Sequence, residues 1–100
     1  MVKTVVLYGH PEDPAAFEEY YASTHMPIAA RMSGVSRFEA SRALPAPDGT
    51  PAPFYRVAEL WFDSAEQMQA TMGSPEGRAT SADIANFATG GVTFMVAEVD

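Results

Sequence analysis

The residues best suited to chemistry lie in one short stretch, residues 21–27. Tyr21 and His25 are four positions apart, a spacing that puts both on one face of a helix, with Phe17 one turn earlier. Histidine gives and takes protons near neutral pH, and the last turn of a helix favours a positive charge. His25 is therefore a candidate general acid/base. Taken alone, this pair favours the alternative, a histidine that binds the last carbonyls of its helix.

Asp83 is the second candidate for a chemical role. It lies in a later helical segment with Phe87 on the same face. If both helices cover the same face of a sheet, the Asp83 carboxylate can hydrogen-bond to His25 and orient the imidazole ring. An exposed carboxylate on a helix surface is the more common state of an aspartate, and the residues alone favour it.

Two aromatic residues, Tyr55 and Trp61, lie in a predicted strand at positions that point one way, and they are candidates for the floor of a ligand pocket. Packing in the hydrophobic core is the more frequent role of such residues. His10 lies in a turn between prolines and acidic residues, and no ligand spacing joins it to His25, so we expect no metal site.

The composition excludes several classes of protein. The chain has 100 residues and no cysteine, which excludes a thiol nucleophile, a disulfide scaffold, a zinc ribbon and an iron–sulfur cluster. Its net charge is −7 and its six basic residues are scattered, which argues against nucleic acid and anionic membranes as partners. No apolar run approaches the ~18 residues of a membrane span. We expect one cytoplasmic domain, residues 1–100, without a signal peptide.

The strands that must position these residues are indicated by β-branched and aromatic runs. They predict strands at residues 2–8, 35–44, 54–62 and 92–99, with a proline-rich loop between the second and the third.

The helices are indicated by their caps. Asp13 followed by Pro14 begins a helix that we expect to end near His25, because Pro27 disfavours the helical conformation of the residue before it. A second helical region spans residues 65–72, and a serine–proline pair restarts a helix at residue 75.

The resulting order is β-α-β-β-α-β. It predicts an α+β, ferredoxin-like fold, a four-stranded antiparallel sheet with helices on one face. Several of the strands are apolar on both faces, so we expect a second copy of the chain to cover the open face and form a homodimer.

A set of residues spread over nearly the whole chain matches the pattern of a known family. The set comprises Tyr8, Pro11, Asp13, Phe17, Tyr20, Tyr21, His25, Pro27 and Gly34, then residues 55–64 and 74–77, and finally Asp83, Asn86 and Phe87. With these residues the chain resembles the EthD family, named for the ethyl tert-butyl ether degradation protein, in the dimeric α/β-barrel group. The resemblance implies two protomers paired through their sheets, each with a cleft around Tyr21, His25 and Asp83.

Three functions stay open. In the first, the protein binds a small apolar or aromatic metabolite in that cleft and is a lyase, isomerase or cyclase that needs no cofactor. His25 is then the general acid/base, Asp83 orients it and Tyr21 polarises a substrate oxygen. The substrate-binding residues expected for it are Phe17, Tyr55, Trp61 and Phe87.

The other two functions use the same cleft differently. Bacterial members of the family resemble accessory proteins of catabolic clusters with a cytochrome oxygenase, which suggests a carrier of a hydrophobic metabolite without catalysis. The third function is a monooxygenase of the dimeric α/β-barrel type, either free of cofactors or with a haem held by His25.

Overall fold

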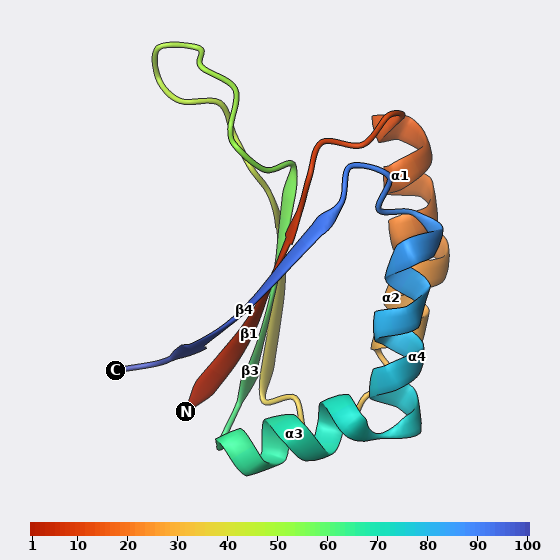
Figure 1. Cartoon of the computed structure of the whole chain (residues 1–100), viewed down its shortest axis with the longest axis vertical. Coiled ribbons are helices and arrows are strands. Elements are labelled where there is room, and N and C mark those ends of the chain that lie inside the picture. Colours follow the sequence, from red (N-terminus) through yellow and green to blue (C-terminus); the bar gives the residue numbers. More distant parts are fainter.

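The computed structural model describes the whole chain, residues 1–100, as a sheet with helices on one face (Figure 1). The strands are β1 (Val2–Tyr8), β2 (Arg37–Arg42), β3 (Arg56–Phe62) and β4 (Val92–Glu98). They form one antiparallel sheet in the order β2-β3-β1-β4. This arrangement confirms the predicted ferredoxin-like, α+β fold.

Strands β2 and β3 each begin two residues later than the sequence predicted, and β2 also ends two residues earlier. The segment between them carries prolines, which have no N–H to donate to a neighbouring strand. The loop extends beyond the end of the sheet (Figure 1).

The first helical segment is one continuous rod built from α1 (Pro14–Tyr20), a five-residue π-helical turn η1 (Tyr21–His25) and α2 (Met26–Ala29). The expectation that the helix ends near His25 is therefore wrong. Pro27 has no N–H, and in an ordinary helix its ring would crowd the carbonyl one turn earlier. The wide turn lies just before this proline, and in it the Met26 N–H bonds to the Tyr21 carbonyl, five residues back.

The second helical region consists of α3 (Ala65–Gly73), α4 (Pro75–Asp83) and a 3-10 turn η2 (Ile84–Asn86). A serine caps the start of each helix: the Gln67 N–H donates to Ser64 Oγ, and the Gly77 N–H donates to Ser74 Oγ, each at 3.1 Å. The restart of a helix after Ser74 was predicted from the serine–proline pair. Helix α3 crosses one end of the sheet, and α4 then runs back beside α1 and α2 (Figure 1).

The hydrophobic core lies between the sheet and this helical layer. Alternate residues of the two central strands point to the helices, and Tyr8 and Phe62 are the largest side chains that are fully buried. The core cluster comprises Val6, Tyr8, Phe17, Tyr21, Ala58, Leu60, Phe62, Ile84 and Phe87.

The other face of the sheet has no other element of the chain over it (Figure 1). The strand register places Val5, Leu7, Val57, Trp61 and Met95 on this face. The sequence predicted this two-sided apolar character of the central strands.

Candidate functional site

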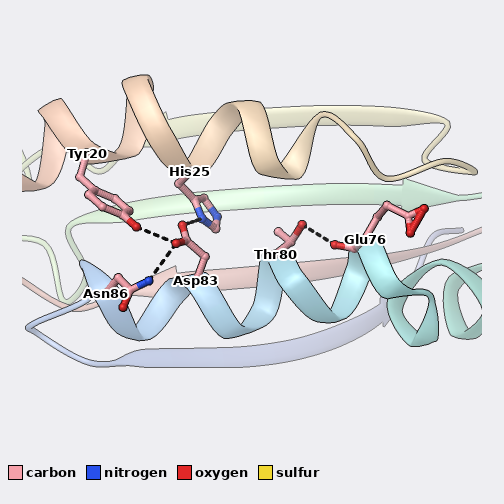
Figure 2. Close-up of polar contacts among 6 residues, drawn as sticks. All are labelled: Tyr20, His25, Glu76, Thr80, Asp83 and Asn86. Carbon is pink, nitrogen blue, oxygen red and sulfur yellow. Dashed lines mark hydrogen bonds and ion pairs between the residues drawn. The ribbon is translucent and has the colours of Figure 1, made fainter.

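The centre of the site is a buried pair of side chains, one from each helical segment. His25 lies in the π-helical turn and Asp83 ends α4, and His25 Nδ1 is 2.9 Å from Asp83 Oδ2. The two residues are only 3% and 8% exposed, respectively. Both side chains point into the space between the two helices (Figure 2).

Two more side chains hold Asp83. The Tyr20 hydroxyl donates to Asp83 Oδ1 at 2.6 Å, and the Asn86 amide donates to the same oxygen at 3.0 Å (Figure 2). Burial raises the pKa of Asp83, but the hydrogen bonds from Tyr20, His25 and Asn86 together outweigh it and leave the pKa below its usual value.

The charge of Asp83 decides the form of the histidine ring. An ionised carboxylate has no proton to donate, so His25 Nδ1 carries the hydrogen and donates it. In the neutral ring the lone pair is then on Nε2, on the side of the ring away from Nδ1. This is the form that a general base requires.

The π-helical turn explains why Tyr20 reaches Asp83. A bond between residues five apart widens the turn, so side chains five apart, such as Tyr20 and His25, come onto the same face. In a regular helix, residues three and four apart share a face. The turn therefore brings both groups onto one carboxylate.

His25 also lines a small, mostly apolar cavity between the helices and the sheet. The cavity has a volume of about 30 Å³, and its walls include Thr4, Tyr21 and Ile84. A larger groove of about 520 Å³ adjoins it along α2 and β2. The cavity and the groove share five lining residues, Met26, Ala29, Met32, Phe38 and Leu60.

Tyr21 is packed against His25 as its spacing predicted. The two rings stack with centroids 5.6 Å apart, and the Arg56 guanidinium lies 4.7 Å from the centroid of the Tyr21 ring. Glu18 holds Arg56 in place through an ion pair. Burial raises the pKa of Tyr21 to about 12, so its hydroxyl stays protonated at neutral pH. That buried hydroxyl has no hydrogen-bond partner in the protein.

The four residues expected to bind substrate lie in different places. Phe87 is in contact with His25, with ring centroids 4.7 Å apart, and Phe17 packs behind Tyr21. Tyr55 packs edge-on against Phe17 and donates a hydrogen bond to Glu18. None of the four is among the residues that line the cavity.

Trp61 lies on the opposite face of the sheet from His25. Its side chain packs between Lys3 and Arg37, at 5.0–5.2 Å from their charged groups. The expectation that Tyr55 and Trp61 share one strand face is wrong, because β3 begins only at Arg56 and the regular alternation does not extend to Tyr55.

Sequence reasoning gave no role at the site to Tyr20, Asn86, Thr4 or Arg56. The spacing of Asn86, three residues after Asp83, is a usable signal for a contact on one helix face. Pro27 inside a helical pattern signals a local distortion, which is what moves Tyr20 into the site.

The remaining histidine, His10, has a structural contact in the turn after β1. His10 Nε2 donates to the Ala52 carbonyl at 2.7 Å and so ties the first turn to the proline-rich loop. The chain holds no group of three or more histidine, aspartate and glutamate side chains placed to bind a metal ion. No helix is long and apolar enough to cross a membrane.

Comparison with known proteins gives the family. The chain is 42% identical over 95 residues to an uncharacterized 11.0 kDa protein from the thcB-thcC intergenic region of Rhodococcus erythropolis, covering 95% of this chain and 91% of the relative. The crystal structure of an ethyl tert-butyl ether degradation (EthD) family protein from Bacillus halodurans is 35% identical, with a TM-score of 0.92 over 100% of this chain and 99% of that one.

A second solved structure agrees with these. An EthD-like protein from Ralstonia eutropha is 29% identical, with a TM-score of 0.74 over 98% of this chain and 90% of that one. The model of the EthD domain matches residues 9–91, which include the whole His25–Asp83 site. The chain therefore belongs to the EthD family.

Proposed function

We propose that this protein is an acid–base enzyme, of the lyase, isomerase or cyclase type, that acts on a small and largely apolar molecule. The observation that carries the proposal is a buried His25–Asp83 pair whose histidine lines an apolar cavity. Each of these reaction types needs a proton removed and a proton returned, and one correctly held imidazole can do both.

The roles of the residues follow from their contacts. His25 Nε2 takes and returns the proton, while Asp83 keeps the hydrogen on Nδ1. Tyr20 and Asn86 act through Asp83, because both donate to its Oδ1 and limit its rotation. Tyr21 stacks on the imidazole and keeps the ring from turning.

The ligand class follows from the shape and lining of the site. A cavity of about 30 Å³ holds only about two water molecules, given that each needs ~10–15 Å³. The adjoining groove of about 520 Å³ is within the range of ~300–1,000 Å³ typical of small-molecule sites. We therefore propose that the ligand occupies the groove and extends one end past Met26 and Met32 toward His25. Methionine side chains adapt well to such a role.

We also propose that the working form is a homodimer in which a second copy covers the open face of the sheet. The apolar side chains on that face support this, because a sheet face of this kind is stable in water only when something covers it.

The proposed binding site is tested by nuclear magnetic resonance of the histidine rings. The chain has two histidines, His25 at the cavity and His10 in a distant turn, so His10 is an internal control. Small ketones and aromatic hydrocarbons should shift the His25 ring signals in a saturable way and leave those of His10 unchanged. Equal shifts at both rings, or none at His25, would contradict the site. Binding without any turnover that depends on His25 would instead support a carrier.

A further inference from the structure

Two buried hydroxyl groups in this protein have no hydrogen-bond partner within it, Thr4 Oγ1 and Tyr21 Oη. Thr4 is 5% exposed and lies on β1, and Tyr21 is 4% exposed and lies in the π-helical turn. Both residues line the cavity that His25 lines. These unpartnered hydroxyls come from opposite walls, the sheet and the helices.

The other buried threonines behave differently. The Thr80 hydroxyl also belongs to a residue of the cavity wall, but it donates to the Glu76 carbonyl at 2.8 Å (Figure 2). The Thr71 hydroxyl donates to the Ser33 carbonyl at 2.6 Å. Both helical threonines use a backbone carbonyl, whereas Thr4 has no such contact.

An unpaired buried hydroxyl lowers the stability of a protein, because the group loses its hydrogen bonds to water and gains none. At position 4 a valine would keep the shape of the side chain and suit the strand better. Thr4 therefore needs an explanation outside the packing of the core, and its place on the cavity wall supplies one.

We infer that Thr4 and Tyr21 bind a carbonyl oxygen of the ligand, so that the molecule taken by this site is an apolar ketone, aldehyde or ester. The inference rests on the proposed function, since it names the polar group of the same ligand. A carbonyl oxygen has two lone pairs and no hydrogen, which matches two hydroxyl donors. The hydroxyls would also draw charge onto that oxygen while His25 moves a proton at a neighbouring carbon.

The experiment measures the binding of matched probes in which the carbonyl oxygen is replaced by a methylene group. Two pairs are used: 2-butanone with 2-methylbut-1-ene, and acetophenone with α-methylstyrene. They are titrated into the parent protein, Thr4→Val, Tyr21→Phe and the control Thr80→Val, whose hydroxyl is already used by the backbone.

We expect the parent protein to prefer the carbonyl member of a pair. Thr4→Val and Tyr21→Phe should each weaken binding of the ketone by about 3- to 10-fold, the effect of one neutral hydrogen bond, and leave the alkene unchanged. Thr80→Val should leave the preference unchanged. Equal binding of both members, or the same preference in Thr4→Val as in the parent, would overturn the inference while leaving the apolar site standing.

Failure of the proposed function has a different signature, since neither member of any pair would then bind the parent protein, and the inference would fall with it. Thermal unfolding without ligand is a separate arm. Thr4→Val should unfold at the same temperature as the parent or higher, and Thr80→Val at a lower one. A loss of stability in Thr4→Val as large as that in Thr80→Val would show that the Thr4 hydroxyl has a partner and would overturn the inference.

Discussion

At the scale of single residues, Asp83 connects the parts of the site. Its two carboxylate oxygens accept hydrogen bonds from Tyr20, His25 and Asn86, and no lysine or arginine is among its hydrogen-bond partners. A carboxylate bonded in this way holds its charge although it is buried. It can therefore fix the position of the hydrogen on His25.

Replacing Asp83 by asparagine should change the tautomer of His25, that is, which ring nitrogen carries the hydrogen. Tyr20 and Asn86 both donate to Oδ1, so the oxygen of the new amide would stay at that position and its NH2 group would face His25. An NH2 group donates to Nδ1 and cannot accept a hydrogen from it, so the ring hydrogen would move to Nε2. Nitrogen-15 resonances of the ring, with His10 as reference, should show Nδ1 protonated in the parent and Nε2 protonated in Asp83→Asn. The same protonated nitrogen in both proteins would contradict the assignment.

The same carboxylate should make the protein sensitive to acid. The pKa of Asp83 is lower in the folded chain than its ordinary value of 3.8. The pKa of Glu18 is lower than its ordinary 4.5, because hydrogen bonds from Arg56 and Tyr55 and the nearby positive charges outweigh the effect of burial. Their stabilising contribution is complete above the unfolded values and is lost as the pH falls through the folded ones.

Denaturant unfolding between pH 7 and pH 3 checks this dependence. The free energy of unfolding should fall below about pH 5, and Asp83→Asn should lose less on acidification than the parent. At pH 7 that variant should be less stable by about 1.5–3 kcal/mol, the value of a hydrogen bond to a charged group. A parent protein whose stability is flat down to pH 3 would refute the assignment of these charges.

The site was only partly predictable from single residues. The spacing of Tyr21 and His25 placed both rings together, and the family resemblance brought Asp83 to them. Tyr20 was beyond such reasoning, because the rule for a regular helix puts it on another face than His25. Thr4 was missed because a threonine in an apolar strand gives no sign of whether its hydroxyl is paired.

At the scale of elements, two features position the side chains of the site. They are the π-helical turn before Pro27 and the corner between α3 and α4. Caps and prolines in the sequence predicted the start of each helix. The sequence pattern did not predict that the first helix continues past Pro27. A residue before a proline disfavours the helical conformation, but here the wider π-helical turn lets the helix continue. The burial of Tyr21 and His25 is thereby preserved.

The corner between the two helices depends on Gly77. A Cβ atom there would overlap the Thr71 carbonyl oxygen, whereas a Cβ at Gly73, at the end of α3, would meet nothing within 4 Å. Gly77→Ala should therefore force α4 away from α3 and destabilise the protein by about 1–3 kcal/mol. Gly73→Ala should be neutral or stabilising by up to ~1 kcal/mol, since it removes freedom from the unfolded chain.

Unfolding in denaturant measures both variants. Because α4 carries Asp83, Gly77→Ala should also disturb the His25 ring signals, and Gly73→Ala should not. Equal stability of the two variants would mean that the corner tolerates a side chain, and that the close approach at Gly77 has no role in placing Asp83.

At the scale of the whole molecule, the open face of the sheet is the feature that a single chain does not explain. The register places Met95 beside Val5 on this face, and Met95 is 48% exposed in the protomer. The order of strands and helices along the chain and the two-sided apolar pattern were both predicted from the sequence. The identity of the covering surface was not, because apolar patterning gives no partner.

Met95→Glu should separate the proposed dimer into monomers, because a charge would be buried against apolar side chains. The neighbouring Val96→Glu is the matched control, since Val96 is 58% exposed and points to the other face of the same strand. Light scattering should give the mass of a dimer for the parent and Val96→Glu, and the mass of a monomer for Met95→Glu. The expected dimer interface buries about 2,000 Å² in total. A monomeric parent at micromolar concentration would contradict the dimer.

His25 is proposed to move a proton of a molecule bound at the cavity, and the exchange of deuterium into a ketone measures that step. In deuterium oxide, the methyl hydrogens of acetophenone should exchange for deuterium faster with the parent protein than without protein. Mass spectrometry or proton resonance measures this exchange. His25→Ala should lower that rate by about 10²–10⁴, the usual contribution of a general acid/base. His10→Ala, which alters the histidine of the distant turn, should keep the parent rate. A parent rate no higher than that of folded His25→Ala would contradict acid–base catalysis by His25.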